Sequence, residues 1–234
     1  HRDLHKEYRR QRQMCIRDRR SPNHLIMKYY SLSNPTIKTS FENAVVHGIA
    51  PDRGLYFPEE IPSLDSSFFA ELPQLSIPEI AYTAMAPFVG DEIPKAVLEN
   101  ILKNTLDFDF PVIPVTDNMG SLELFHGPTL AFKDVGAKFM ASCLDIFKDS
   151  YTSKKITVLV ATSGDTGGAV ARGFSDTKDI NVCILYPKGK ISKVQEKQIT
   201  TNGSYVQAIE VEGDFDLCQS MVKREFSDEE VNRK

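Results

Sequence analysis

The sequence Ile-Thr-Val-Leu-Val-Ala at residues 156–161 passes directly into Thr-Ser-Gly-Asp-Thr-Gly-Gly at residues 162–168, and this junction decides the fold class. The first run is apolar and rich in β-branched residues, which is typical of a strand buried in a parallel sheet. The glycine-rich second run predicts a loop after that strand. A helix is expected next, over residues 169–174, so the stretch predicts a strand–loop–helix unit.

The same alternation continues toward the C-terminus. Further strands are expected at residues 181–186 and 205–211, and further helices at 191–201 and 214–226. Strands and helices joined by short connections indicate βαβ units, so the sequence predicts an α/β fold with a parallel sheet flanked by helices. Ligands of such sheets bind beyond the carboxyl ends of the strands. The loop at 162–168 is therefore expected in a binding site.

The preceding part of the chain has a different pattern. Residues 58–110 contain amphipathic helical runs separated by prolines, Pro87 among them. Helices are expected to begin at Pro78 and Pro94, because proline is tolerated in the first turn of a helix. Ser40 is a candidate cap for a further short helix. These signals predict an α-rich N-terminal domain.

Two domains are therefore expected, at residues 27–110 and 111–234. Residues 1–26 carry eight Lys or Arg against three Asp or Glu, whereas the whole chain has a net charge of −4. A basic arm is compatible with nucleic-acid binding or a transit peptide. We favour a third interpretation, that residues 1–26 are a translated sequencing adapter and that Met27 is the natural start. The second domain is expected to be incomplete.

Several classes of protein are disfavoured by composition. The four cysteines are widely spaced and form no CxxC pair, so neither a metal site nor a disulfide framework is indicated. Reduced thiols in a cytoplasmic protein are the expectation. No apolar run approaches the roughly 18 residues of a membrane span.

Residues 126–134, His-Gly-Pro-Thr-Leu-Ala-Phe-Lys-Asp, hold the side chain that we expect to carry the chemistry. After a turn, Lys133 stands among apolar residues at the start of a helix expected over residues 135–147. One apolar face of that helix is expected to be buried, and it consists of Phe139, Cys143, Ile146 and Phe147. A neutral lysine amine attacks carbonyl groups and forms Schiff bases. The ordinary alternative is a solvated surface lysine.

Two other segments are candidates for binding an anion. Residues 163–167 offer hydroxyl groups and free backbone N–H groups where a helix begins. Lys188, Lys190 and Ser192 follow the second strand and suit a phosphate group. Neither segment matches the dinucleotide or P-loop pattern. A tight turn and a solvent-exposed helix start are the respective alternatives.

Four stretches together resemble the threonine synthase family, in the form found in bacteria and fungi. They are Leu-Glu-Leu-Phe-His-Gly-Pro-Thr-Leu-Ala-Phe-Lys-Asp at 122–134, Ala-Thr-Ser-Gly-Asp-Thr-Gly at 161–167, Ile-Leu-Tyr-Pro-Lys-Gly-Lys-Ile-Ser at 184–192, and Glu-Gly-Asp-Phe-Asp at 212–216. The resemblance extends over residues 27–230. It implies a fold type II pyridoxal-phosphate enzyme in which a parallel sheet flanked by helices follows an α-rich N-terminal domain.

The resemblance also implies an activity. The family converts O-phospho-L-homoserine and water to L-threonine and phosphate with pyridoxal 5'-phosphate as cofactor. Lys133 matches the lysine that holds the cofactor and moves protons at the substrate's Cα and Cβ. The residues that match the cofactor-binding loop are Ser163, Gly164, Asp165, Thr166 and Gly167. Further candidates, for contacts with the substrate, are Thr162, Lys190 and Ser192.

The family continues beyond residue 234, and its loop for the cofactor phosphate is expected there. The chain as given is therefore expected to bind cofactor weakly and to be inactive alone. Another fold type II enzyme, such as a threonine or serine dehydratase, is the alternative within enzymes. A non-catalytic nucleic-acid-binding module is the alternative of another class, but the body of the chain lacks interleaved aromatic and basic residues. We expect a small-molecule substrate and neither nucleic acid nor membrane as partner.

Overall fold

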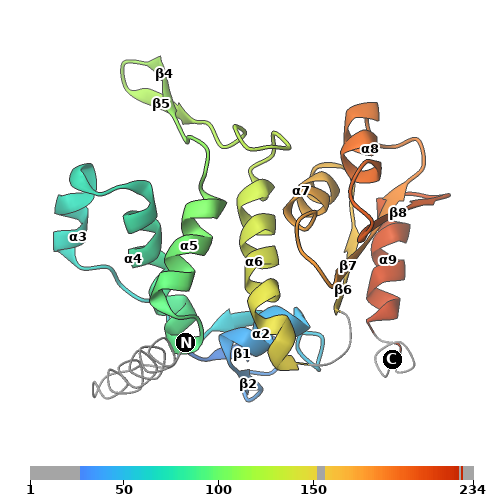
Figure 1. Ribbon diagram of the computed structural model, residues 1–234, viewed down its shortest axis with the longest axis horizontal. Coiled ribbons are helices and arrows are strands. Elements are labelled where there is room, and N and C mark those ends of the chain that lie inside the picture. Colours follow the sequence, from blue (N-terminus) through green and yellow to red (C-terminus); the bar gives the residue numbers. More distant parts are fainter. Residues whose placement is uncertain (1–26, 152–155, 227, 229–234) are drawn as a thin grey trace, which may run out of the picture.

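The computed structural model describes residues 27–151, 156–226 and 228. Helix α6 (Lys133–Tyr151) stands between two assemblies (Figure 1). One assembly contains the N-terminal helices and a small sheet, and the other contains the α/β layers. The interpretation of residues 1–26 as non-native lies outside the described residues.

The predicted parallel sheet is confirmed. Strands β6 (Ile156–Ala161), β7 (Ile180–Pro187) and β8 (Val206–Val211) pair in parallel in that order. Ala161 is in register with Leu185, and Leu185 is in register with Ile209, so the carboxyl ends of the three strands lie side by side. β6 is half-buried rather than buried as expected, because it lies at an edge of the described sheet.

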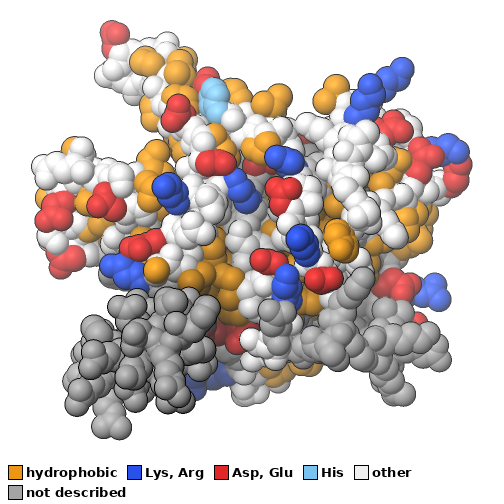
Figure 2. All heavy atoms as spheres, in the orientation of Figure 1, with side chains coloured by type: hydrophobic (Ala, Val, Ile, Leu, Met, Phe, Trp, Pro, Cys, Tyr) orange, Lys and Arg blue, Asp and Glu red, His pale blue; other side chains and the backbone are white. Residues whose placement is uncertain are grey.

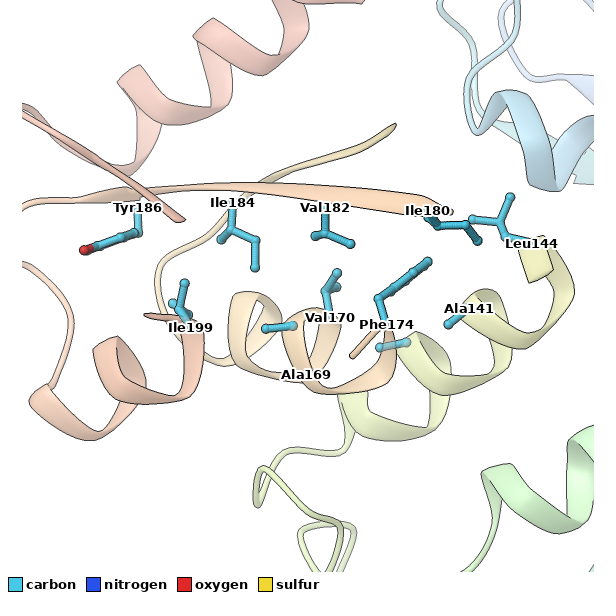
Figure 3. Packing of buried hydrophobic residues seen from close by; sticks show 12 residues of the cluster. Ala141, Leu144, Ala169, Val170, Phe174, Ile180, Val182, Ile184, Tyr186 and Ile199 are labelled. Atoms are coloured by element: carbon cyan, nitrogen blue, oxygen red, sulfur yellow. The ribbon is translucent and has the colours of Figure 1, made fainter. Parts of the chain in front are cut away.

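Helices cover both faces of this sheet. Ile180, Val182 and Ile184 of β7 pack against α6, α7 (Asp165–Gly173) and α8 (Lys193–Thr200). Figure 3 shows Val170 and Phe174 pointing from the α7 region toward β7. On the opposite face, Leu185 and Val211 pack against α9 (Phe215–Glu225) through Cys218 and Val222. The result is a three-layer α/β arrangement.

Helix α6 has two buried faces, of which the sequence predicted one. Cys143 and Phe147 lie in a core with the N-terminal helices, as the apolar spacing indicated. Ala137, Ala141 and Leu144 form the second face and pack against α7 and β7. Small alanine side chains give a weak hydrophobic signal but allow close approach between helices, and this face joins the two assemblies.

The N-terminal assembly is rich in helices, as expected, but also contains a small sheet. Its helices are α2 (Phe41–His47), α3 (Ser66–Glu71), α4 (Ile77–Val89) and α5 (Lys95–Thr105). Its strands are β1 (Tyr29–Ser31), β2 (Lys38–Thr39) and β3 (Tyr56–Pro58), which pair antiparallel in the order β2-β1-β3. Ser40 caps α2 as predicted, because its hydroxyl accepts a hydrogen bond from the Asn43 N–H at 3.1 Å.

One expectation about this assembly was wrong. Pro87 was expected to separate two helices, but it lies inside α4, near the end of that helix. Proline removes one backbone donor and crowds the preceding turn. The loss is offset here by burial, since Val89 at the end of α4 is fully buried and packs in the same core as Ile93 and Leu98.

Strands β4 (Val112–Thr116) and β5 (Met119–Leu122) form an antiparallel hairpin that projects from the body (Figure 1). Every residue of both strands is exposed. Figure 2 shows hydrophobic side chains gathered on this projection, among them Val112, Val115 and Met119. An isolated two-stranded hairpin is only marginally stable in water, so the hairpin depends on its flanking segments for its position.

Two features are absent from the described residues. None of their helices is both long and apolar enough to cross a membrane. The same residues contain no group of three or more His, Cys, Asp or Glu side chains arranged to hold a metal ion.

Cys143 is predicted to be unreactive in the folded protein. Burial raises the pKa of its thiol to about 12, and the residue is fully buried in the core that α6 shares with the N-terminal helices. We expect iodoacetamide at about pH 8 to leave Cys143 unmodified until denaturant is added, because an ordinary thiol ionises near 8.5. Between about pH 8.5 and pH 12 the Cys143 thiol keeps its proton in the folded protein but loses it in the unfolded chain. The buried thiol therefore contributes to the free energy of unfolding below about pH 8.5, and this contribution declines as the pH rises toward 12. Peptide mapping checks the labelling, and modification of native Cys143 at the rate of a free thiol would contradict the packing.

Candidate functional site

Lys133 lies at the first position of α6 and reaches the first turn of α7, just after the loop that follows β6. Its Nζ donates a hydrogen bond to Thr166 Oγ1 at 2.7 Å, across 33 positions of sequence. Both side chains are half-buried. The structure thus brings together the lysine and the loop that the sequence singled out separately.

A buried carboxylate holds the turn that delivers Lys133. Asp134 is 4% exposed and accepts hydrogen bonds from the Thr129 backbone N–H, at 2.9 Å, and from the Thr129 hydroxyl. Leu130, between them in the turn, has a positive φ of 61°. Buried carboxylates are costly unless they accept hydrogen bonds, so this pairing ties the turn to the start of α6. The sequence placed Asp134 in the motif but predicted no role for it.

The buried side chain of Thr162 holds the backbone of the residues that follow β6 through hydrogen bonds. The residue is 1% exposed, and its Oγ1 accepts hydrogen bonds from the Gly164 N–H at 3.0 Å and the Gly167 N–H at 2.8 Å. A Cβ at Gly167 would lie 2.6 Å from the Thr162 Cγ2. Only glycine therefore fits beneath this threonine without displacing it.

Helix α7 begins at Asp165, four residues earlier than the sequence predicted. The expectation was wrong because consecutive glycines are ordinarily loop residues. Here they lie in the first turn of a helix and give close packing against neighbours. Consequently Asp165, Thr166 and Gly167 present the N-terminal end of a helix to the site, where backbone N–H groups and the helix dipole favour negative charge.

Gly164 is predicted to be intolerant of a side chain. Its φ of 139° is one that other residues rarely adopt, and an added Cβ would lie 2.4 Å from Gln195 Nε2. We expect Gly164→Ala to lower the free energy of unfolding by about 1–3 kcal/mol. Denaturant unfolding measures this. Gly203→Ala is the control, because a Cβ there meets only the Ser175 carbonyl oxygen at 3.8 Å. Equal stability of the two variants would contradict the geometry.

Ser163 and Asp165 are both exposed, and Asp165 borders a hollow beside Lys133. A hollow of about 350 Å³ is lined by Asp165, Lys133 and Phe132, together with apolar residues of segments 122–125 and 130–131. A second hollow, of about 440 Å³, is lined by Lys133, Phe132 and Thr166 and by apolar residues of α6 and α7. Apolar hollows with a few convergent polar groups are typical of small-molecule sites. An amine at their border can bond covalently to a carbonyl compound held there.

The segment after β7 lies apart from this lysine. Ser192 caps α8, since its Oγ accepts a hydrogen bond from the Gln195 N–H at 3.2 Å. Lys190 is exposed, and Lys188 forms an ion pair with Glu212. Within the described residues no hydrogen bond or ion pair joins Lys190 or Ser192 to Lys133. Their link to the first turn of α7 is Gln195, which we did not single out from the sequence, although Ser192 and Gln195 have the Ser-x-x-Gln spacing of a capping box.

Known proteins match the chain in both sequence and structure. The family model "Threonine synthase N terminus" matches residues 28–106. Threonine synthase of Escherichia coli is 42% identical over 205 residues, which cover 88% of this chain and 47% of that protein. The enzyme of Haemophilus influenzae is 44% identical over 207 residues, with 88% and 48% coverage. The chain thus spans about half the length of the curated relatives that it matches.

Solved structures give the same result. The crystal structure of threonine synthase from Escherichia coli superposes with a TM-score of 0.81, at 42% identity, covering 88% of this chain and 47% of that one. The pyridoxal-phosphate-bound threonine synthase from Brucella melitensis superposes with a TM-score of 0.79, at 38% identity, with 87% and 45% coverage. The α/β layers and these matches agree, and the chain belongs to the threonine synthase family, of whose members it spans about half the length, with the fold type II architecture.

Proposed function

We propose that this chain carries the lysine-bearing part of a pyridoxal-phosphate-dependent threonine synthase, which converts O-phospho-L-homoserine and water to L-threonine and phosphate. The observation that carries the proposal is the contact of Lys133 Nζ with Thr166 Oγ1 at the carboxyl end of β6, in a chain 42% identical to the threonine synthase of Escherichia coli. A dehydratase of the same fold type is the alternative, and no feature of the described residues favours it.

The residues around Lys133 fit this cofactor. Its aldehyde requires an amine, which Lys133 supplies at the border of two hollows. Its flat aromatic ring requires apolar walls, which Phe132, Val135 and Met140 supply. Its ring oxygen and the substrate carboxylate require hydrogen-bonding partners, and Ser163, Gly164, Asp165, Thr166 and Gly167 are the residues that we assign to them. We assign the cofactor phosphate to a part of the family's sequence beyond this chain.

The proposed mechanism assigns separate tasks to the side chains. When bound, the cofactor serves as an electron sink for the pair left on carbon after proton removal. Lys133 Nζ removes and returns protons at the substrate's Cα and Cβ, which is general acid–base work. The Thr166 hydroxyl accepts a hydrogen bond from that nitrogen and fixes its direction. Asp134 holds the turn before it.

The further candidates receive different tasks. Lys190 and Ser192 are exposed at the start of α8, where a cation, a hydroxyl group and a helix N-terminus suit the phosphate of the substrate. Thr162 was expected to contact the substrate. Since its hydroxyl is buried and accepts two backbone N–H groups, we propose instead that it shapes the loop.

We also propose the two-domain division at residues 27–110 and 111–234. Its support is the family model, which ends at residue 106, and the change from helices to the β4–β5 hairpin after α5. In this division α6 belongs to the second domain and contributes one face to the core of each.

The test uses the protein expressed at the length of its relatives with Met27 as first residue. It is incubated with pyridoxal 5'-phosphate and O-phospho-L-homoserine, and threonine and phosphate are both measured. We expect the two products in equal amounts. A protein that retains the cofactor but releases no threonine would contradict the proposal. Formation of a 2-oxo acid from serine or threonine instead would favour the dehydratase.

A further inference from the structure

Gln195 joins the two loops that lie beyond neighbouring strands of the sheet. The residue is in the first turn of α8, which follows β7. Its Nε2 donates a hydrogen bond at 2.8 Å to Oδ1 of Asp165, the first residue of α7 after the loop that follows β6. Its Oε1 accepts a hydrogen bond from the Ser192 N–H at 2.9 Å. One side chain therefore connects a proposed cofactor-binding residue with the cap of α8.

The orientation of this amide is fixed by its two partners. A backbone N–H is only a donor, so the Gln195 oxygen must face Ser192. An ionised carboxylate is only an acceptor, so the Gln195 nitrogen must face Asp165. If the amide were reversed, its nitrogen would face the Ser192 N–H, donor against donor, and its oxygen would face the Asp165 carboxylate, acceptor against acceptor. The hydrogen bond to Asp165 therefore follows from the capping interaction of α8.

Gln195 also covers the backbone beside Asp165. A Cβ on Gly164 would lie 2.4 Å from Nε2 and 2.5 Å from Cδ of Gln195, so the amide group packs directly on this glycine. Asp165 is otherwise exposed, and its carboxylate borders the same hollow as Lys133. Without Gln195 this carboxylate would be free to rotate into solvent.

We propose that Gln195 is a positioning residue that holds the Asp165 carboxylate in its working direction and couples it to the start of α8. This inference rests on the proposed function, in which Asp165 binds the cofactor. It adds a link between that residue and Ser192, the candidate for the substrate phosphate. The amide of Gln195 is hydrogen-bonded to both segments and connects them directly.

Gln195→Glu tests the link with little disturbance of the helix. Glutamate is a regular residue of the capping box, so the contact with Ser192 is retained. The donor toward Asp165 becomes a carboxylate, which repels it. Loss of a hydrogen bond to a charged group predicts a dissociation constant for pyridoxal 5'-phosphate raised about tenfold or more. Absorbance titration measures the dissociation constant, and steady-state kinetics separate kcat from KM.

The double variant Asp165→Asn/Gln195→Glu reverses the hydrogen bond, because the asparagine donates and the glutamate accepts. We expect its dissociation constant for pyridoxal 5'-phosphate to be lower than the value obtained by multiplying the fold-changes of the two single variants. A merely structural role in α8 would give independent effects, and independent effects would overturn the inference. If Gln195→Glu fails to fold, Gln195→Met combined with Asp165→Asn forms the same cycle. In that cycle we expect Asp165→Asn to raise the dissociation constant for the cofactor by a smaller factor in the Gln195→Met variant than in the parent protein.

Val194→Glu is the matched control. It adds the same charge in the same turn of α8, on a side chain that is 67% exposed. We expect cofactor affinity within about twofold of the parent, as for most surface substitutions. An equal loss in this control would assign the effect to charge alone and overturn the inference. Absence of threonine formation by the parent protein would instead defeat the proposed function, so the two failures are distinguishable.

Discussion

Lys133→Ala is expected to lower kcat by about 10³-fold or more while leaving the protein folded. The substitution removes the amine that we assign both to cofactor attachment and to proton transfer. In the described structure this amine makes its hydrogen bond to Thr166 Oγ1 at 2.7 Å. The measurement is threonine formation by the protein at the length of its relatives, with circular dichroism to establish folding.

Two controls separate chemistry from charge. Lys133→Arg keeps a long side chain with N–H donors, but a guanidinium does not deprotonate in proteins and forms no Schiff base, so we expect the same loss. Lys138→Ala removes a lysine of the same helix that pairs with Asp107 at 2.8 Å on the surface. Such pairs contribute about 0–1 kcal/mol, and activity should persist. Retained activity in Lys133→Arg would contradict the role of the amine.

Phe174→Ala is expected to lower the free energy of unfolding by about 3–5 kcal/mol. Phe174 is fully buried where α7 ends, and its ring lies in the core that α6 and α7 share with Ile180 of β7 (Figure 3). Removal of the ring leaves a cavity in the layer that supports both Lys133 and the loop after β6. Denaturant unfolding gives the value directly.

The control for this substitution is Phe69→Ala. Phe69 lies in α3 and is 58% exposed, so the change in unfolding free energy should remain within about 0.5 kcal/mol. Equal losses in the two variants, or a loss below about 1 kcal/mol for Phe174→Ala, would contradict the packing described for α7 against β7.

The fold class was predictable because its signal is local. The β-branched run at residues 156–161 and the alternation after it gave the parallel sheet correctly. The start of α7 was not predictable, because Gly167 and Gly168 are poor helix residues and only their tight packing against Thr162 and Gln198 accounts for them. Strands β1 and β2 were missed for another reason. They are only 3 and 2 residues long and form by pairing across the chain.

The site was predictable in its parts but not in its assembly. Lys133 and Thr166 were both identified, yet their contact spans 33 positions and depends on α6 packing against α7 through alanines. Asp134 received no role because a single Asp in a helix has no spacing signal. Gln195 received none although its spacing from Ser192 is that of a capping box. Asp134 matters because it is buried, and Gln195 matters because it is hydrogen-bonded to both Ser192 and Asp165.

The most direct test is chemical trapping at Lys133. The protein at the length of its relatives is mixed with pyridoxal 5'-phosphate, reduced with borohydride, digested and analysed by peptide mass spectrometry. Reduction makes the bond between a lysine amine and the cofactor aldehyde permanent, so the label records which amine carried it. We expect one labelled peptide, with the modification on Lys133. Labelling spread over surface lysines, or concentrated on Lys138 or Lys190, would contradict the assignment of Lys133 as the cofactor-binding residue.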